Sequence, residues 1–303
     1  MKYTKTAKSF GDQAQLLIDR GFMVANKQEL ENYLKKVNYY RLSGYWYSFK
    51  VIDPISGNES FKPGTSFDSI RERYEFDRQL RLLLMDSIER IEVAILRTRM
   101  VELHTRLHGP FGYTNLKSFD PKFSKKSFQN LLNDILDDET RSHEEFIQRY
   151  RHKYTGEKYL PLWMAVEIMS FGQLFTLYRN SEHAIKKSIS SEFNLFPPVF
   201  DSWLHSLNYI RNACAHHMRL WNRPLPVMPW IPRKKHDPRW QQPIPIGNTR
   251  VFIILTIIRY LLNTLDSGNR WNITVMKLLK NYPNIPLQPM GFPKRWQEIV
   301  FWK

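Results

Sequence analysis

Apolar residues recur along most of the chain at intervals of three and four positions, which is the spacing of one face of a helix. One such stripe consists of Leu84, Ile88, Ile91 and Ile95. It predicts a long helix that begins after Ser66, a suitable N-cap residue. About 40 residues at 1.5 Å each would extend roughly 60 Å, so we expect this helix to bend or break. Because no run alternates apolar and polar residues convincingly, as a half-buried strand does, the pattern predicts an all-α fold.

Glycine, proline and serine interrupt the helical pattern at two places. They are concentrated at 53–66, where we expect a loop, and seven prolines fall within 224–245. Neither a helix nor a central strand tolerates that density of proline. We therefore expect an N-terminal helical segment, 1–60, and a helical domain, 61–303, with the Pro-rich insertion at 224–245. The remaining predicted helices are two or three short ones within 10–50, two polar ones within 124–154, a buried one over 161–180 that has Pro161 in its first turn, and three more over 198–217, 249–265 and 271–281.

The charge balance favours a polyanionic partner. The chain has 45 Lys and Arg against 29 Asp and Glu, a formal net charge of +16, and the excess is spread over most of the sequence. Such a charge attracts polyanions, nucleic acid first. The single cysteine, Cys214, excludes an intrachain disulfide and fits a reducing cytoplasm. The most apolar run, 251–265, contains Arg259 and is shorter than the ~20 residues of a bilayer span, so no membrane association is expected. Neither a secretory signal nor a metal- or cofactor-binding motif is recognisable.

The stretch "RNACAHHMRLWNR", 211–223, gathers Arg, His and Asn at the end of a predicted helix. Spacing alone carries little weight, because Arg99 and His104 repeat the separation of Arg211 and His216. On an ideal helix, however, the residues of this segment sort onto two faces. A core stripe consists of Trp203, Leu207, Ile210 and Cys214. The opposite face consists of Asp201, His205, Asn208, Asn212 and His216. Poor helix formers with hydrogen-bonding side chains suit a polar site or interface better than a solvated surface.

Arg211 falls at the edge of the core stripe. One chemistry that suits an Arg and a His without metal-binding carboxylates is the cleavage of RNA by its own 2′-OH. An imidazole can take the 2′-OH proton or protonate the leaving oxygen, and a guanidinium can stabilise charge on the phosphoryl oxygens. The products would be a 2′,3′-cyclic phosphate and a 5′-OH, without a metal or other cofactor. The two side chains lie about 140° apart on an ideal helix. Either the helix is distorted at its end, or a second copy of the motif completes the site. His217 falls on the flank of the core stripe and is expected to border the core. We expect Asn212 and His217 to support the site rather than to carry its chemistry.

Four stretches together, in the same order, resemble the bacterial abortive-infection proteins of the AbiD/AbiF type. They are "VNYYRLSGYWYSF" (37–49), "YEFDRQLRLLLMDSIERIEVAILRTR" (74–99), "PLWMAVEIMSFGQLFTLY" (161–178) and "LNYIRNACAHHMRLWNR" (207–223). That type is similar to a branch of the HEPN superfamily, whose signature is matched by Arg211, Asn212 and His216. The resemblance implies an HEPN-like helical bundle and a homodimer in which two motifs face each other. It also implies a metal-independent endoribonuclease, a phage-defence toxin silenced by an antitoxin RNA or protein.

Further residues are candidates for contact with RNA. Aromatic and Arg side chains alternate at Tyr40, Arg41 and Trp46, where they can stack on unpaired bases, with core packing as the alternative. Arg219 and Arg223 follow the motif, where phosphates of a bound RNA would lie. Two other functions stay open: a non-catalytic RNA-binding module, and a protein-interaction module of a phage-defence system whose basic surface meets an acidic partner.

Overall fold

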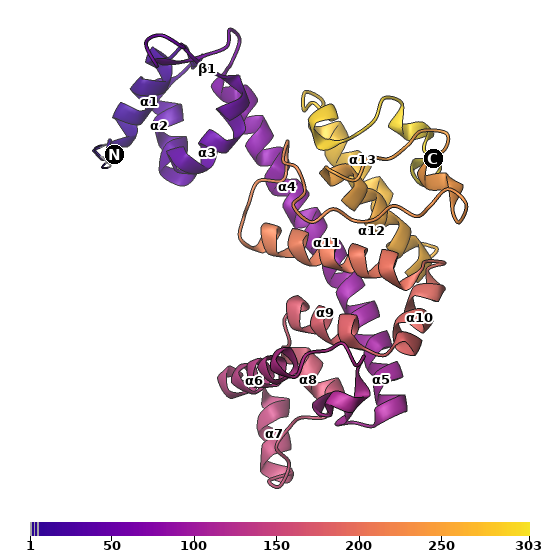
Figure 1. Cartoon of the computed structure of the whole chain (residues 1–303). Coiled ribbons are helices and arrows are strands. Elements are labelled where there is room, and N and C mark those ends of the chain that lie inside the picture. The colour runs from indigo at the N-terminus through magenta and orange to yellow at the C-terminus, as the bar shows by residue number, and fades with distance from the viewer. Residues whose placement is uncertain (1, 3, 5) are drawn as a thin grey trace. The chain divides into compact units, whose positions relative to one another are not determined.

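Helices make up most of the computed structural model, which describes residues 2, 4 and 6–303 (Figure 1). The predicted all-α fold is confirmed, because the strands within those residues are limited to one short hairpin, β1 (Lys50–Ile52) and β2 (Glu59–Phe61). The α-helices are α1 (Phe10–Asp19), α2 (Lys27–Lys36), α3 (Tyr39–Trp46), α4 (Phe67–Ile91), α5 (Met100–His108), α6 (Lys125–Arg141), α7 (Glu145–Lys153), α8 (Leu162–Ile168), α9 (Phe171–Asn180), α10 (His183–Glu192), α11 (Pro197–Ala215), α12 (Val251–Leu265) and α13 (Trp271–Asn281).

The chain divides into two units that are each assembled from separate stretches of sequence. Unit 1 contains the described residues up to Arg81, together with Arg219–Trp221 and Met276–Pro286. Unit 2 contains Leu82–Met218, Asn222–Val275 and Leu287–Lys303. Helix α4 contributes its first part to unit 1 and its last part to unit 2. The boundary near residue 60 that the sequence suggests stays a prediction.

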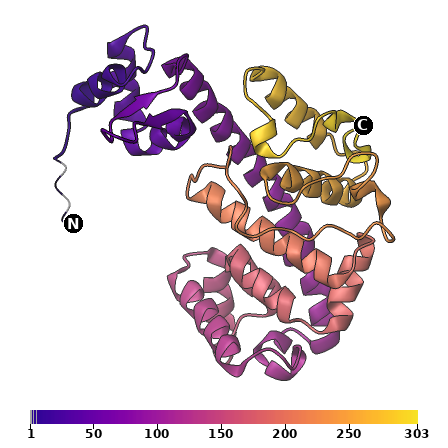
Figure 2. The same ribbon diagram turned by 45° about the horizontal axis from the view of Figure 1, so that its top comes forward.

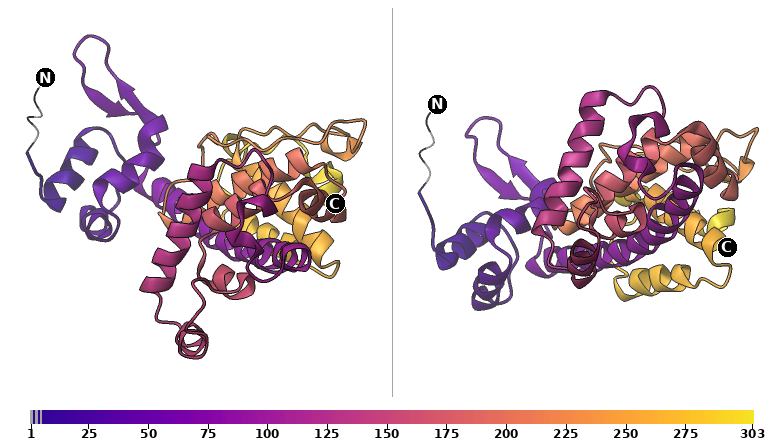
Figure 3. Two further views of the ribbon diagram at one scale, coloured as in Figure 1. Left: turned by 60° about the horizontal axis from the view of Figure 1, so that its bottom comes forward. Right: turned by 90° about the horizontal axis from the view of Figure 1, so that it is seen from below.

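Aromatic side chains form the core of unit 1. The ring centroid of Phe22 lies 5.6 Å from that of Trp46 and 4.9 Å from that of Phe61. Phe61 ends β2, which pairs antiparallel with β1 in the register Lys50↔Phe61 (Figure 3). The hairpin replaces part of the loop predicted at 53–66. Its strands have three residues each, too few for an alternating pattern to be visible in the sequence.

Helix α4 begins where the sequence predicts. The backbone N–H of Ser69 donates to Ser66 Oγ at 3.2 Å, which makes Ser66 the N-cap. The predicted apolar stripe is buried throughout: Leu84, Ile88, Ile91 and Ile95 are each at most 1% exposed. The expected irregularity takes the form of a π-helical segment, Glu92–Arg99, after which α5 continues to His108. Gly109 then ends the helix with a φ of 75°, a conformation that glycine adopts without steric cost.

Helix α11 lies at the centre of unit 2 and packs against α9, α10 and α12 (Figure 2). Helix α12 is buried over nearly its whole length, as its apolar sequence predicts. The prediction of a single helix over 161–180 is wrong, because α8 ends at Ile168 and a separate helix, α9, begins at Phe171. Ser170 and Gln173 form a capping box, in which the Ser170 hydroxyl accepts from the backbone N–H of Gln173 and the side-chain Oε1 of Gln173 accepts from the backbone N–H of Ser170.

Candidate functional site

Helix α11 carries the Arg/His cluster and begins with Pro197 and Pro198. Proline is tolerated in a first turn because the N–H groups there have no partner within the helix. The predicted core stripe is confirmed: Trp203, Leu207, Ile210 and Cys214 are each at most 4% exposed. This buried stripe fixes the rotation of the helix about its axis, and so it directs the opposite face away from the core.

The polar face of α11 is available to solvent along much of its length. His205, Asn212 and His216 are exposed, and Asn208 is half-buried. The His205 ring stacks on Phe175 of α9, with centroids 5.5 Å apart and planes 13° from parallel. Partial burial, and then the nearby Arg179 cation, lower the pKa of His205. Both effects favour a neutral His205 that can take part in stacking and hydrogen bonding.

The helix ends at the two histidines in a Schellman turn. The N–H of Met218 donates to Ala213 O at 2.7 Å, and that of His217 donates to Cys214 O at 2.9 Å. His216 is the C-cap with φ −85° and ψ 11°, whereas His217 has a φ of 55°, unusual for a residue with a Cβ. His217 is exposed. The expectation that it borders the core is therefore wrong, because the helix ends before the position that an ideal wheel assigns to it.

Arg211 is half-buried at the edge of the core, as expected. Its Nη1 donates to Asn212 Oδ1 at 3.3 Å, and Asn212 Nδ2 donates to Asn208 Oδ1 at 3.4 Å. The structure thus joins Arg211, Asn212 and Asn208 in a short polar chain. The helix itself ends at Ala215, and the ψ of 11° at His216 lies outside the helical range. Among the described residues, no hydrogen bond connects these two side chains.

The motif lies within a long stretch of the chain that matches a known protein family. The sequence model of a family described as Abi-like protein matches residues 32–222, which is more than half of the chain. The chain belongs to the Abi-like protein family. Membership indicates an abortive-infection protein, and abortive infection is a form of phage defence. No curated protein and no solved structure matches the chain.

Three of the segments that mark this Abi-like protein meet in unit 1 at Asp77, a residue that sequence reasoning missed. Its carboxylate is 0% exposed and accepts from the Tyr45 hydroxyl and from Arg81 Nη1, each at 2.6 Å. It also accepts from the backbone N–H groups of Leu220, at 3.2 Å, and of Trp221, at 2.7 Å. These donors compensate for the loss of water around a buried charge. Asp77 therefore anchors the chain a few residues after the motif.

Arg219, a predicted phosphate contact, belongs to the same part of unit 1. Its Nη1 donates to the backbone oxygen of Gly44, and its side chain is half-buried. This bond gives Arg219 a structural role in holding the segment that follows the motif. Arg223, the other predicted phosphate contact, is half-buried in unit 2.

The three residues proposed to stack on bases differ greatly in exposure. Tyr40 is 88% exposed, Arg41 is half-buried and Trp46 is 1% exposed. The Trp46 ring is enclosed by Phe22, Phe61 and Tyr39, the last at a centroid distance of 5.2 Å. Its assignment to RNA binding is therefore wrong, because a ring enclosed in the core cannot stack on a base. For Trp46 the core-packing alternative holds, and Tyr40 remains available.

A groove of about 690 Å³ adjoins the start of the polar face of α11 in this Abi-like protein. It is lined by Asp201 of α11, by Phe175 and Arg179 of α9, and by Lys186 of α10. Burial raises the pKa of Asp201, and the Lys186 cation opposes that rise. The remaining charged residues of the groove are Asp120 and Lys122. The groove therefore has more basic than acidic side chains. It adjoins the face of α11 that carries His and Asn residues.

The second Arg–His pair with the motif's spacing forms no exposed site. Arg99 makes ion pairs of 2.6 Å with Glu102 and with Glu192. His104 is 2% exposed, and burial, followed by the neighbouring His108, lowers its pKa to about 4. Its ring packs among other aromatic rings, so His104 is part of the core of unit 2, whereas Arg99 is partly exposed and held by the two carboxylates.

Two searches of the described residues gave negative results. No group of three or more His, Cys, Asp or Glu side chains there is arranged to hold a metal ion. No helix in that part of the chain combines the length and the apolar character needed to cross a bilayer.

Proposed function

We propose that this Abi-like protein is a toxin-like endoribonuclease of the HEPN type, in which Arg211 and His216 carry the chemistry. The observation that supports this most directly is the exposed position of His216 at the C-cap of α11, at the end of a face of His and Asn side chains. An imidazole in contact with solvent can meet a substrate. The Arg211 guanidinium, hydrogen-bonded to Asn212 on the same helix, can contact phosphate. In the cell, an antitoxin RNA or protein would keep such an activity silent.

The proposed reaction is an internal transesterification of RNA. The ribose 2′-oxygen bonds to the adjacent phosphorus, and the bond between that phosphorus and the 5′-oxygen breaks. A neutral imidazole takes the 2′-OH proton, and a protonated one gives a proton to the leaving 5′-oxygen. Arg211 stabilises the charge that develops on the non-bridging oxygens. The products are a 2′,3′-cyclic phosphate and a 5′-OH, and the reaction requires neither a metal nor a cofactor.

A homodimer supplies the acid and the base together. One motif offers a single His216, and Arg211 lies about 140° away around the helix axis. Two copies of the exposed end of α11 that face each other would bring one imidazole to each side of the scissile phosphate. The shared site thus accounts for the angular separation within one helix.

RNA is the polyanion that we infer from charge and surface chemistry. The net charge of +16 draws a strand to the protein, and the exposed side chains of Arg179 and Lys122 offer phosphate contacts beside the polar face of α11. His205, stacked on Phe175, adds a flat surface on the same side of the helix.

The test compares four purified proteins: wild type, Arg211→Ala, His216→Asn and His217→Asn. Asparagine tolerates the left-handed conformation of residue 217, so the last variant is a matched control for backbone strain. Each protein is incubated with total bacterial RNA, and new 5′-OH and 2′,3′-cyclic phosphate ends are sequenced. We expect Arg211→Ala and His216→Asn to lose at least about 100-fold in rate, and His217→Asn to stay within a few-fold of wild type.

Growth on induction should follow the same order, with toxicity lost in the first two variants and retained in His217→Asn. If wild type produces no new ends and the variants are equally toxic, the nuclease proposal fails. RNA that still co-purifies in that case supports the non-catalytic RNA-binding alternative. If wild type produces no new RNA ends and no RNA co-purifies with it, the result supports the protein-interaction alternative.

A further inference from the structure

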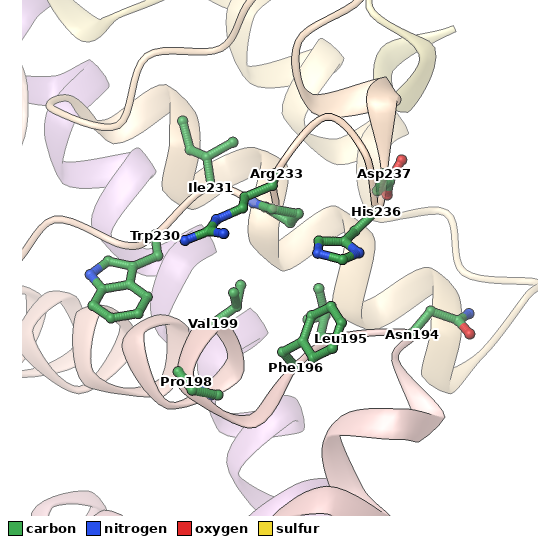
Figure 4. A pocket seen from close by; sticks show the side chains of 11 residues that line it. Asn194, Leu195, Phe196, Pro198, Val199, Trp230, Ile231, Arg233, His236 and Asp237 are labelled. Carbon is green, nitrogen blue, oxygen red and sulfur yellow. The ribbon is translucent and has the colours of Figure 1, made fainter.

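A pocket of about 330 Å³ opens at the N-terminal end of α11, opposite the end that carries His216 (Figure 4). One wall is the turn before α11 and its first residues, and the other is part of the Pro-rich segment. The lining residues used in the argument are Phe196, Val199, Trp230, Arg233, His236 and Asp237. All of them belong to unit 2. Residues 230–237 also lie outside the range that the Abi-like family matches.

Two large aromatic side chains at this pocket are exposed, although their backbone positions are fixed. Trp230 is 59% exposed and Phe196 is 53% exposed. The N–H of Trp230 donates to Ser202 Oγ at 2.9 Å, and its carbonyl accepts from the indole of buried Trp203 at 2.8 Å. The Phe196 ring lies against His236, with centroids 4.6 Å apart. Exposed rings on an ordered backbone are ready to stack on a flat ligand at low entropic cost.

A cationic segment adjoins the pocket. Arg233 lines the pocket, and Lys234 and Lys235 follow it in the chain; these three residues are called the rim. All three are exposed, and none of them forms an ion pair within the described residues. Asp237 also lines the pocket, but its carboxylate accepts from Arg239 Nε and Nη2, each at 2.8 Å, and from the Trp240 indole at 3.1 Å. Figure 4 shows this carboxylate directed away from Phe196 and Val199. The charge that a ligand meets is therefore positive.

We propose that this pocket binds an unpaired base of single-stranded RNA, with the neighbouring phosphates on Arg233, Lys234 and Lys235. A base offers the flat face that Trp230 requires, and its backbone offers the negative charge that the rim requires. Identifying the polyanion as RNA rests on the proposed function. Along α11, Val199 and His216 lie about 26 Å apart at 1.5 Å per residue, so a strand of several nucleotides anchored in the pocket reaches the motif. The pocket then helps to select single-stranded substrates.

The experiment measures the binding of a fluorescently labelled single-stranded RNA by anisotropy, on the full chain with His216→Asn present in every sample. That background prevents cleavage from changing the ligand. Adding Trp230→Ala should raise Kd about tenfold, the scale of one stacked base. Trp163→Ala is the matched control, because Trp163 is 51% exposed on α8 of the same unit, and it should leave Kd within about twofold.

A second pair of variants tests the cationic rim. Replacing Lys234 and Lys235 by alanine should reduce the slope of log Kd against log salt by about 1.4, since each contact with single-stranded phosphate contributes about 0.7. Lys277 and Lys280, both exposed on α13, provide the control, and their replacement should leave the slope unchanged. Equal slopes for the two pairs would contradict a phosphate-binding rim.

Duplex RNA and a conservative variant separate stacking from other causes. Trp230→Ala should not weaken binding of duplex RNA, whose bases are already stacked, and Trp230→Phe should recover most of the single-strand affinity. The inference is overturned if Trp230→Ala and Trp163→Ala have the same Kd, or if duplex binding falls equally. It is also overturned if Trp230→Ala leaves RNA binding unchanged and instead abolishes binding of a protein partner.

The two proposals can fail independently. If wild type cleaves RNA but Trp230→Ala does not change the Kd for single-stranded RNA, the pocket proposal fails and the nuclease proposal stands. If Trp230→Ala raises that Kd tenfold but wild type produces no new RNA ends, the pocket proposal stands and the nuclease proposal fails. If the protein does not bind single-stranded RNA at all, the pocket inference is wrong.

Discussion

Asp77 accepts a hydrogen bond of 2.7 Å from the backbone N–H of Trp221, a residue 144 positions later in the sequence. The same carboxylate also binds Tyr45 and Arg81. One buried charge thus connects α3, α4 and the segment after the Arg/His motif, all within unit 1. The shared contact gives a physical reason why these stretches occur together in an Abi-like sequence.

Asp77→Asn should destabilise unit 1 by about 3 kcal/mol, because it leaves the buried Arg81 without its counter-charge. Denaturant unfolding followed by tryptophan fluorescence measures the change. Asp68→Asn is the control on the same helix, since Asp68 pairs with Arg71 at the surface with its side chain 67% exposed. We expect that change to cost less than about 1 kcal/mol. Equal unfolding midpoints for the two variants would show that the Asp77 network contributes little.

The role of Asp77 could not be predicted from its local sequence. Asp77 and Arg81 are four positions apart on α4, and so are Asp86 and Arg90. The first pair is at most 7% exposed, whereas the second has side chains 62% and 43% exposed. The difference arises from segments that pack against Asp77 from elsewhere in the chain. An Asp–Arg spacing of four predicts an ion pair on a helix, but not its burial.

Periodicity predicted the long elements well and their ends less well. The core stripe of α11 follows from the positions of Trp203 and its apolar neighbours. The Schellman turn at the end of α11 could not be predicted from the sequence, because its left-handed position holds His217 rather than the usual Gly or Asn. The division between α8 and α9 was missed because apolar residues continue across it. Ser170 and Gln173 carried a capping-box signal that could have revealed the division.

Stability should fall between pH 6.5 and pH 4 because of His104. Burial, and then the proximity of His108, lower its pKa from 6.5 to about 4 in the folded protein. The unfolded chain therefore binds a proton in this window while the folded chain does not, so acidification favours unfolding. The contribution reaches about 3 kcal/mol near pH 4 and vanishes above pH 6.5. Unfolding free energies measured at several pH values across this range test the effect.

His104→Phe should remove that part of the pH dependence, since a phenyl ring can pack beside Phe119, whose centroid lies 5.2 Å from that of His104. Exposed His143 offers the control, and His143→Ala should keep the pH dependence of wild type. An identical pH dependence in His104→Phe and wild type would assign the acid sensitivity to other groups.

Gly291→Ala should destabilise unit 2 by about 2 kcal/mol. Gly291 has a φ of 90°, and an added Cβ would lie 2.6 Å from Arg250 Cβ, so strain and overlap act together. Gly247 is the comparison, because a Cβ there meets nothing within 4 Å. Gly247→Ala should be neutral or should stabilise by up to about 1 kcal/mol. Thermal unfolding of both variants provides the measurement, and equal losses would contradict the steric argument.

If two copies of α11 share one active site, an inactive protomer should inhibit the active protomer with which it pairs. Light scattering should give a mass near twice 36.4 kDa. Excess His216→Asn protein, exchanged with wild type, should suppress RNA cleavage steeply, because mixed dimers lack either the acid or the base. The same excess of His217→Asn should leave cleavage in place, since every dimer then keeps both His216 imidazoles. A strict monomer with full activity, or cleavage that falls only in proportion to dilution, would mean that each chain carries a complete site of its own.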